Sequence, residues 1–100
     1  MTVLIKCVGA AGLVIMLDGS KSRPEGKFLA EFDPEFAEGR GLAKWTADWR
    51  KAMAFDSMGP AFELWRAIPA SRPVRDDGKP NRPLTAFSVT FVDAPEVPRA

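Results

Sequence analysis

The side chains best suited to binding chemistry lie in one basic stretch near the end of the chain, ASRPVRDDGKPNRP at positions 70–83. Three prolines stiffen this stretch, because each ring fixes φ and removes a backbone N–H, and Asp77-Gly78 is a turn pair. We therefore expect a long loop here, called the 70–83 loop, and long loops in small domains are often functional. Its charged side chains are the cations Arg72, Arg75, Lys79 and Arg82 and the carboxylates Asp76 and Asp77.

The positive charge of the 70–83 loop is open to three interpretations. Its cations could neutralise the phosphates of a nucleic acid. They could instead contact a protein partner, since arginine is enriched at interfaces and a stiff loop loses little entropy on binding. In the third interpretation the loop is a structural crossover whose arginines pair with Asp76, Asp77 and nearby carboxylates. The formal net charge is only +1, so no global field attracts nucleic acid or membrane, and a protein partner is the favoured binding interpretation.

The tryptophans supply a second group of candidate binding residues. Trp45, Trp49 and Trp65 could stack against bases or sugars, although aromatic residues at such spacings usually belong to the core. Trp49 is the best candidate for partial exposure, because Arg50 and Lys51 follow it. The candidate partner-binding residues are therefore Arg72, Arg75, Lys79, Arg82, Trp49 and Arg50.

The composition argues against catalysis and against metal binding. The chain has no histidine and one cysteine, Cys7, which excludes imidazole or thiolate zinc sites and Ser–His or Cys–His nucleophile pairs. Asp33, Glu35 and Glu38 could hold a hard cation or act as an acid/base pair, but their spacing matches no calcium loop. We therefore expect no enzyme, no metal and no cofactor. Cys7 is expected to be a small buried apolar residue, in a chain suited to a reducing compartment.

The apolar run CVGAAGLVIML at positions 7–17 follows Lys6 and imitates the start of a secretory signal. No small-x-small cleavage site follows it, and it is shorter than the roughly 20 residues that span a bilayer. We therefore expect neither a signal peptide nor a membrane segment.

Alternating apolar residues predict three strands, at positions 2–8, 27–33 and 84–92. The residues that share one face are Val3, Ile5 and Cys7 in the first strand, Phe28, Ala30 and Phe32 in the second, and Phe87, Val89 and Phe91 in the third. Positions 13–17 are apolar on both faces and predict a short buried strand or buried loop, whereas 18–26 and 34–41 predict an exposed turn and a loop.

Positions 44–55 are ambiguous. Trp45, Trp49, Ala52 and Met53 have helical spacing, but a strand at 43–46, one turn of helix and a strand at 52–55 are slightly favoured, with Thr46 and Asp48 as capping residues. The clearest helix is at 60–68, where Pro60 suits the first helical position. Pro69 ends this helix, because its ring disfavours the helical conformation at Ile68. The apolar stripe of this helix is Ala61, Leu64, Trp65 and Ile68.

This order of elements predicts an α+β fold: one small domain at 1–93, with an antiparallel sheet of about four to five strands and one main helix on one face. Residues 94–100 are expected to be a frayed tail. The expected core consists of Phe28, Phe32, Leu64, Trp65, Ile68, Phe87, Val89 and Phe91.

Six segments together resemble short uncharacterised proteins of bacteriophages and prophages: LIKCV at 4–8, KFLAEFDPEF at 27–36, WTAD at 45–48, AMAF at 52–55, AFELWR at 61–66 and SRPVRDDGKPNRPLTAF at 71–87. The chain departs from them by an apparent insertion around 12–22. The resemblance transfers no catalytic residues. It implies a bacterial cytoplasmic setting and supports the strand, short helix, strand order at 44–55. The resulting expectation is a small non-catalytic binding module that acts on a protein partner through the 70–83 loop, with weak nucleic-acid binding by the same loop as the alternative.

Overall fold

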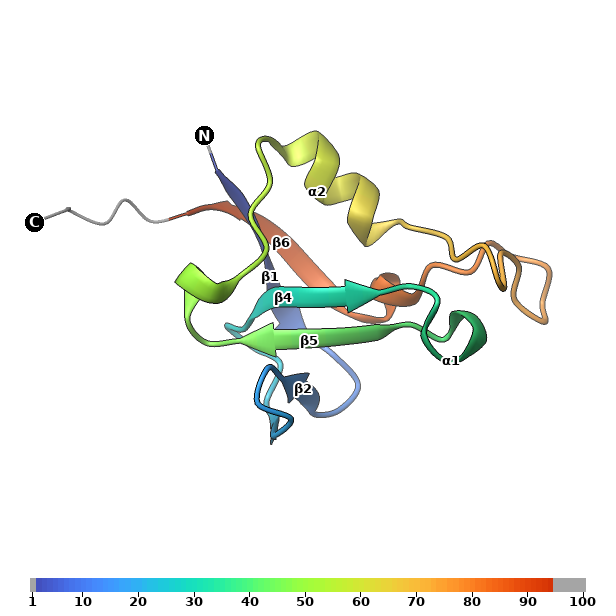
Figure 1. The fold of residues 1–100 in the computed structure, drawn as a ribbon, viewed down its shortest axis with the longest axis horizontal. Helices are drawn as coiled ribbons and strands as arrows, with labels where there is room; N and C mark the ends of the chain where they lie inside the picture. The colour runs from blue at the N-terminus through green and yellow to red at the C-terminus, as the bar shows by residue number, and fades with distance from the viewer. Residues whose placement is uncertain (1, 95–100) are drawn as a thin grey trace, which may run out of the picture.

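The computed structural model describes residues 2–94. Within them the chain forms a six-stranded mixed sheet in the order β3-β2-β5-β4-β1-β6, with one main helix (Figure 1). The fold is therefore α+β, as the sequence predicts. The elements are β1 (Val3–Gly9), β2 (Val14–Met16), β3 (Lys21–Ser22), β4 (Phe28–Asp33), α1 (Phe36–Gly39), β5 (Leu42–Thr46), the 3-10 turn η1 (Trp49–Lys51), α2 (Met58–Trp65), the 3-10 turn η2 (Pro83–Ala86) and β6 (Ser88–Asp93).

The sheet differs from the expected antiparallel sheet of four to five strands in two respects. It has a sixth strand, because Lys21 and Ser22, in a stretch expected to be an exposed turn, pair with β2. In addition, β2 pairs with β5 in parallel, Ile15 opposite Lys44. The apolar run after β1 therefore forms a strand next to β5, on the side away from β4. The pattern of residues within the run does not reveal this position.

The first strand lies inside the sheet, between β4 and β6. Val3, Ile5 and Cys7 share one face and are almost wholly buried, as expected for Cys7, whose thiol is free. Burial raises the pKa of this thiol. Val3 and Ile5 belong to the core, although the expected core did not include them. Leu4, whose side chain points to the opposite face, is also buried.

The predicted face of β4 is wrong because of a β-bulge. Leu29 pairs with Trp45, but Glu31 rather than Ala30 occupies the next position, opposite Lys44. The extra residue reverses the alternation of side chains. Leu29 is therefore completely buried in the core, and Phe32 packs against the same core. Phe28 is only half-buried and lies outside the core.

The favoured interpretation of positions 44–55 is confirmed for the first strand and the helical turn, but the strand expected at 52–55 is reduced to an isolated bridge between Phe55 and Val3. β5 is followed by η1, and the backbone of Phe55 then exchanges two hydrogen bonds with Val3, at 2.8 and 2.9 Å. Asp48 caps η1, since its Oδ1 accepts from the N–H of Arg50 at 3.0 Å. Thr46 Oγ1 accepts from the N–H of Asp48 at 3.1 Å, so both predicted capping residues are engaged.

The main helix α2 begins at Met58, two residues before Pro60, and ends at Trp65. Ala61 packs in the core with β1, and Leu64 and Trp65 pack against that core. Ile68 was expected there but is 44% exposed, because the helix ends at Trp65 and the apolar stripe ends with it. The other expected core residues, Phe32, Phe87, Val89 and Phe91, are partly buried and pack against the core, whose buried members are Val3, Ile5, Cys7, Val14, Leu29, Trp45, Ala61 and Leu84.

The two ends of the described chain meet, since the N–H of Ala94 donates to the carbonyl oxygen of Thr2 at 2.8 Å. The tail that the sequence predicts otherwise lies outside the described residues. No helix in residues 2–94 combines the length and the apolarity that crossing a bilayer requires.

Candidate binding site

The 70–83 loop projects from one end of the molecule, beside α1 (Figure 1). It has hydrogen-bonded structure of its own. The N–H of Arg75 donates to the carbonyl oxygen of Lys79 at 2.8 Å, the N–H of Gly78 donates to that of Arg75 at 2.9 Å, and Val74 and Pro80 form an antiparallel bridge. The loop is therefore a small hairpin with its turn at Asp77-Gly78, where Gly78 has a φ of +84°, and not a long loop without hydrogen-bonded structure of its own.

Glu35 fastens the start of this loop. Its two carboxylate oxygens accept hydrogen bonds from the N–H groups of Ala70, at 2.7 Å, and Ser71, at 2.8 Å. Hydrogen bonding from Ser71, and then from Ala70, lowers the pKa of Glu35. Sequence reasoning placed Glu35 with Asp33 and Glu38 as a candidate cation site, but its oxygens are engaged by the loop backbone.

Asn81 fastens the other end of the loop. Its Nδ2 donates to the carbonyl oxygens of Gly39, at 2.7 Å, and Arg72, at 2.8 Å. Sequence reasoning missed this residue, because nothing in the local pattern around position 81 connects it with position 39.

Asn81 joins the loop to α1. This element is assigned as a helix from its hydrogen bonds, but two of its residues do not have the backbone angles of a right-handed helix. Ala37 and Glu38 have left-handed backbone angles, with φ of +52° and +59°, a conformation that costs an L-residue about 1–2 kcal/mol. Gly39 continues the turn at φ +96°, and a Cβ there would lie 2.6 Å from the Cβ of Arg72. The strained turn and the loop therefore meet in direct contact, and the predicted loop at 34–41 is a tightly folded support for the 70–83 loop.

Two of the loop cations have carboxylate partners within the loop. Arg72 Nη2 lies 2.8 Å from Asp76 Oδ1, and Arg75 Nη2 lies 3.2 Å from Asp77 Oδ2. These are the pairs that the crossover interpretation predicts. Exposed pairs of this kind contribute only about 0–1 kcal/mol, so they leave the guanidinium groups available for exchange with another anion.

The other two loop cations differ from each other. Within residues 2–94, neither Lys79 nor Arg82 forms an ion pair. Lys79 is exposed, whereas the Nε of Arg82 is buried and lacks a hydrogen-bond partner among the described residues. Lys79 is therefore a surface cation, while Arg82 is partly built into the base of the loop.

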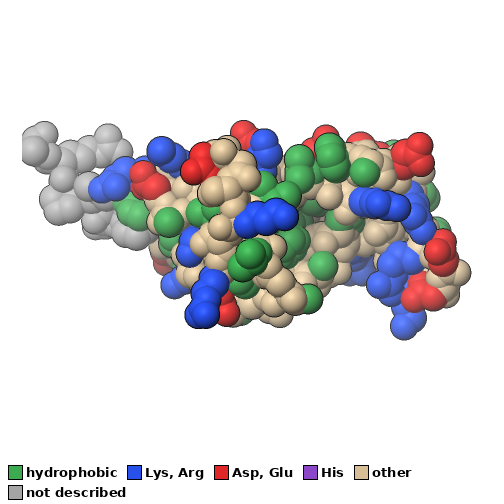
Figure 2. All heavy atoms as spheres, turned by 90° about the horizontal axis from the view of Figure 1, so that it is seen from below, with side chains coloured by type: hydrophobic (Ala, Val, Ile, Leu, Met, Phe, Trp, Pro, Cys, Tyr) green, Lys and Arg blue, Asp and Glu red, His purple; other side chains and the backbone are tan. Residues whose placement is uncertain are grey.

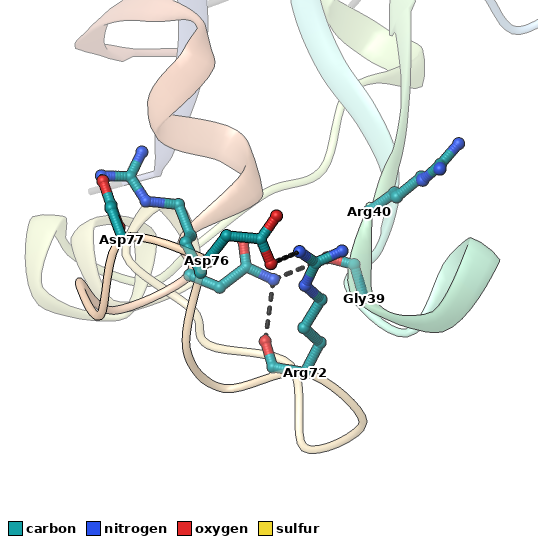
Figure 3. Close-up of a pocket in the computed structure, with 7 residues that line it drawn as sticks. Gly39, Arg40, Arg72, Asp76 and Asp77 are labelled. Atoms are coloured by element: carbon teal, nitrogen blue, oxygen red, sulfur yellow. Dashed lines mark hydrogen bonds and ion pairs between the residues drawn. The ribbon is translucent and has the colours of Figure 1, made fainter.

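The loop and α1 border an open hollow of about 390 Å³ that is lined by the residues of both ion pairs (Figure 3). In Figure 3 the Arg72 guanidinium faces Asp76, whereas Arg40 extends away from them. Arg40 was not a candidate in the sequence, although its position between Gly39 and Gly41 in a turn was a signal of exposure. The lining residues are Gly39, Arg40, Arg72, Arg75, Asp76, Asp77 and Asn81.

Side chains of both charges gather at this end of the molecule, as Figure 2 shows. The structure does not bring Trp49 and Arg50 to them. These residues are in η1, at the opposite end from the 70–83 loop (Figure 1), where the Arg50 guanidinium lies 5.2 Å from the centre of the Trp49 ring. The six candidate residues therefore form two separate groups, the four loop cations at one end and Trp49 with Arg50 at the other, and Arg40 joins the loop cations.

A scan against protein-family models, a search of curated proteins and a search of solved structures found no match to this chain.

Proposed function

We propose that the protein is a small non-catalytic binding module that engages a protein partner through the 70–83 loop. The observation that carries this proposal is the double anchoring of the loop, by Glu35 at its start and by Asn81 at its end. A loop held in this way before binding loses less conformational entropy when a partner docks. The strained residues Ala37 and Glu38 support the same proposal, since strained backbone is concentrated at binding sites.

The charge pattern favours a protein over a nucleic acid. Asp76 and Asp77 lie among the loop cations, so this surface carries both charges and lacks the continuous basic groove that follows a nucleic-acid backbone. Trp49, the candidate residue for stacking against bases, belongs to η1, which lies at the opposite end of the molecule from the loop. The resemblance to phage proteins adds a bacterial cytoplasmic setting to the proposal.

The test is capture of partners from bacterial lysate by the tagged protein, with and without nuclease. A triple variant, Arg72→Ala, Arg75→Ala and Lys79→Ala, leaves Asn81, Arg82 and Glu35 in place and removes exposed charge. Its control removes three cations elsewhere on the surface, Lys21→Ala, Arg23→Ala and Arg66→Ala.

We expect both triple variants to keep the fold, by circular dichroism, and only the loop variant to lose the captured protein. Capture that disappears with nuclease would support the nucleic-acid alternative, and equal capture by the two variants would exclude the loop.

A further inference from the structure

Arg40 lies where three hollows of the surface meet. It borders the hollow that holds the Arg72–Asp76 pair, a second one lined also by Glu38 and Ser71, and a third one on the side of the sheet. Its side chain is exposed, and among the described residues it has no ion-pair partner. A cation in this position can be reached by an anion that lies across all three hollows.

The third hollow is an apolar groove of about 280 Å³. It runs between the start of β2, the strands β4 and β5, and η2, and Arg40 is the charged residue that lines it. Leu13 at its edge is 63% exposed. The groove is therefore suited to an apolar side chain that enters next to an acidic one. Its lining includes Leu13, Phe32, Leu42, Pro83 and Phe87.

Asp76 has the geometry of a ligand that can be exchanged. Its carboxylate lies 2.8 Å from Arg72 Nη2, yet its side chain is 99% exposed, and that contact is the one hydrogen bond its carboxylate makes within residues 2–94. Asp77 differs, because its Oδ1 also accepts from the N–H of Lys79 and so supports the turn. Arg72 therefore binds a carboxylate that nothing else in the described chain holds in place.

We propose that Arg40, Arg72 and the apolar groove form a binding site for an extended acidic segment of a protein partner that carries one apolar anchor residue. In the free protein, Asp76 occupies the carboxylate position on Arg72. On binding, a carboxylate of the partner replaces it, a second one meets Arg40, and the anchor enters the groove beside Phe87. This inference rests on the proposed function, in that the partner is a protein.

Fluorescence anisotropy with labelled, end-capped peptides tests the inference directly. The probe is Glu-Glu-Leu-Glu-Glu, and the comparison peptides are Gln-Gln-Leu-Gln-Gln, which lacks charge, and Glu-Glu-Gly-Glu-Glu, which lacks the anchor. We expect the probe to bind most tightly, and its affinity to fall with salt because the charges are exposed. Equal binding of all three peptides would overturn the proposal.

Two single variants with matched controls test the roles of the residues. Arg40→Ala should weaken binding of the probe about fivefold, the upper range for an exposed ion pair, whereas Arg23→Ala should not change it. Asp76→Ala should strengthen binding about two- to fivefold, because it removes the competing carboxylate. Asp56→Ala changes the net charge equally but is not part of the 70–83 loop or of α1, and should have no such effect.

The expected increase in affinity for the probe peptide in Asp76→Ala is the sharpest readout, because a variant that fails to fold would lose affinity. Unchanged or weaker binding in this variant would overturn the exchange of carboxylates. A labelled single-stranded oligothymidine that displaces the probe would point to nucleic acid instead. If no peptide binds while the loop triple variant still loses capture from lysate, this inference fails and the proposed function stands.

Discussion

The side-chain amide of Asn81 donates to the carbonyl oxygen of Gly39 at 2.7 Å, across 42 positions of the sequence. The same nitrogen donates to the carbonyl oxygen of Arg72. One amide group therefore joins the strained turn of α1 to the start of the hairpin that carries the candidate site.

Replacing Asn81 should destabilise the protein and loosen the loop. Asn81→Ala leaves two carbonyl oxygens without their donor, which costs about 1–3 kcal/mol. Asn81→Asp keeps the shape of the side chain but turns a negative oxygen toward the same carbonyls, so it should cost at least as much. Urea unfolding measures both variants, and an aspartate as stable as the wild type would show that the amide is not a structural donor.

Gly39 should tolerate alanine less well than Gly78. Both have positive φ, +96° and +84°, so alanine introduces backbone strain at each. Only at Gly39 would the new Cβ meet another atom, the Cβ of Arg72 at 2.6 Å, whereas nothing lies within 4 Å at Gly78. We expect Gly39→Ala to lose about 1–3 kcal/mol more than Gly78→Ala in chemical denaturation. Equal losses would mean that the turn and the loop are not in contact.

Part of the stability should depend on ionised Glu35. Hydrogen bonds from Ser71 and Ala70 lower its pKa in the folded protein below the ordinary value of 4.5. A lowered pKa stabilises the fold above the ordinary value, and this contribution is lost as the pH falls through the folded value. The wild type should therefore lose more stability between pH 6 and about pH 3 than Glu35→Gln does.

The control for this pH dependence is Glu63→Gln, an exposed carboxylate of α2. Asp18 also has a lowered pKa, because of hydrogen bonds from Ser20. It adds the same pH dependence of stability to the wild type, Glu35→Gln and Glu63→Gln. Identical pH profiles of urea midpoints for the wild type and Glu35→Gln would show that Glu35 does not hold the loop.

Because of the bulge in β4, we expect replacement of Leu29 to destabilise the protein more than replacement of its neighbour Phe28. Leu29 is completely buried, so Leu29→Ala should cost about 2–5 kcal/mol. Phe28→Ala removes a larger side chain from a half-buried position outside the main core and should cost less. Thermal or urea unfolding of both variants decides the matter, and a larger loss for Phe28→Ala would favour the simple alternation that the sequence suggests.

Sequence alone determined the features that local periodicity controls. The face of β1 with Val3, Ile5 and Cys7 follows from alternation, since a strand with one buried face must place every second side chain there. The stripe of Ala61, Leu64 and Trp65 follows in the same way from helical spacing. Short capping side chains, Asp48 among them, predict the turn after β5, because their contacts are with the next few residues.

Tertiary structure decided the features that depend on distant partners. The bulge at Ala30 arises where β4 pairs with β5, and the parallel pairing of β2 with β5 depends on where the chain returns to the sheet. Glu35 bonds to residues 35 and 36 positions away, and Asn81 to one 42 positions away. Contacts between distant residues produce no periodic pattern in the sequence. The sequence therefore identifies the cations of the 70–83 loop, but not the residues that anchor the loop and not the role proposed for Arg40.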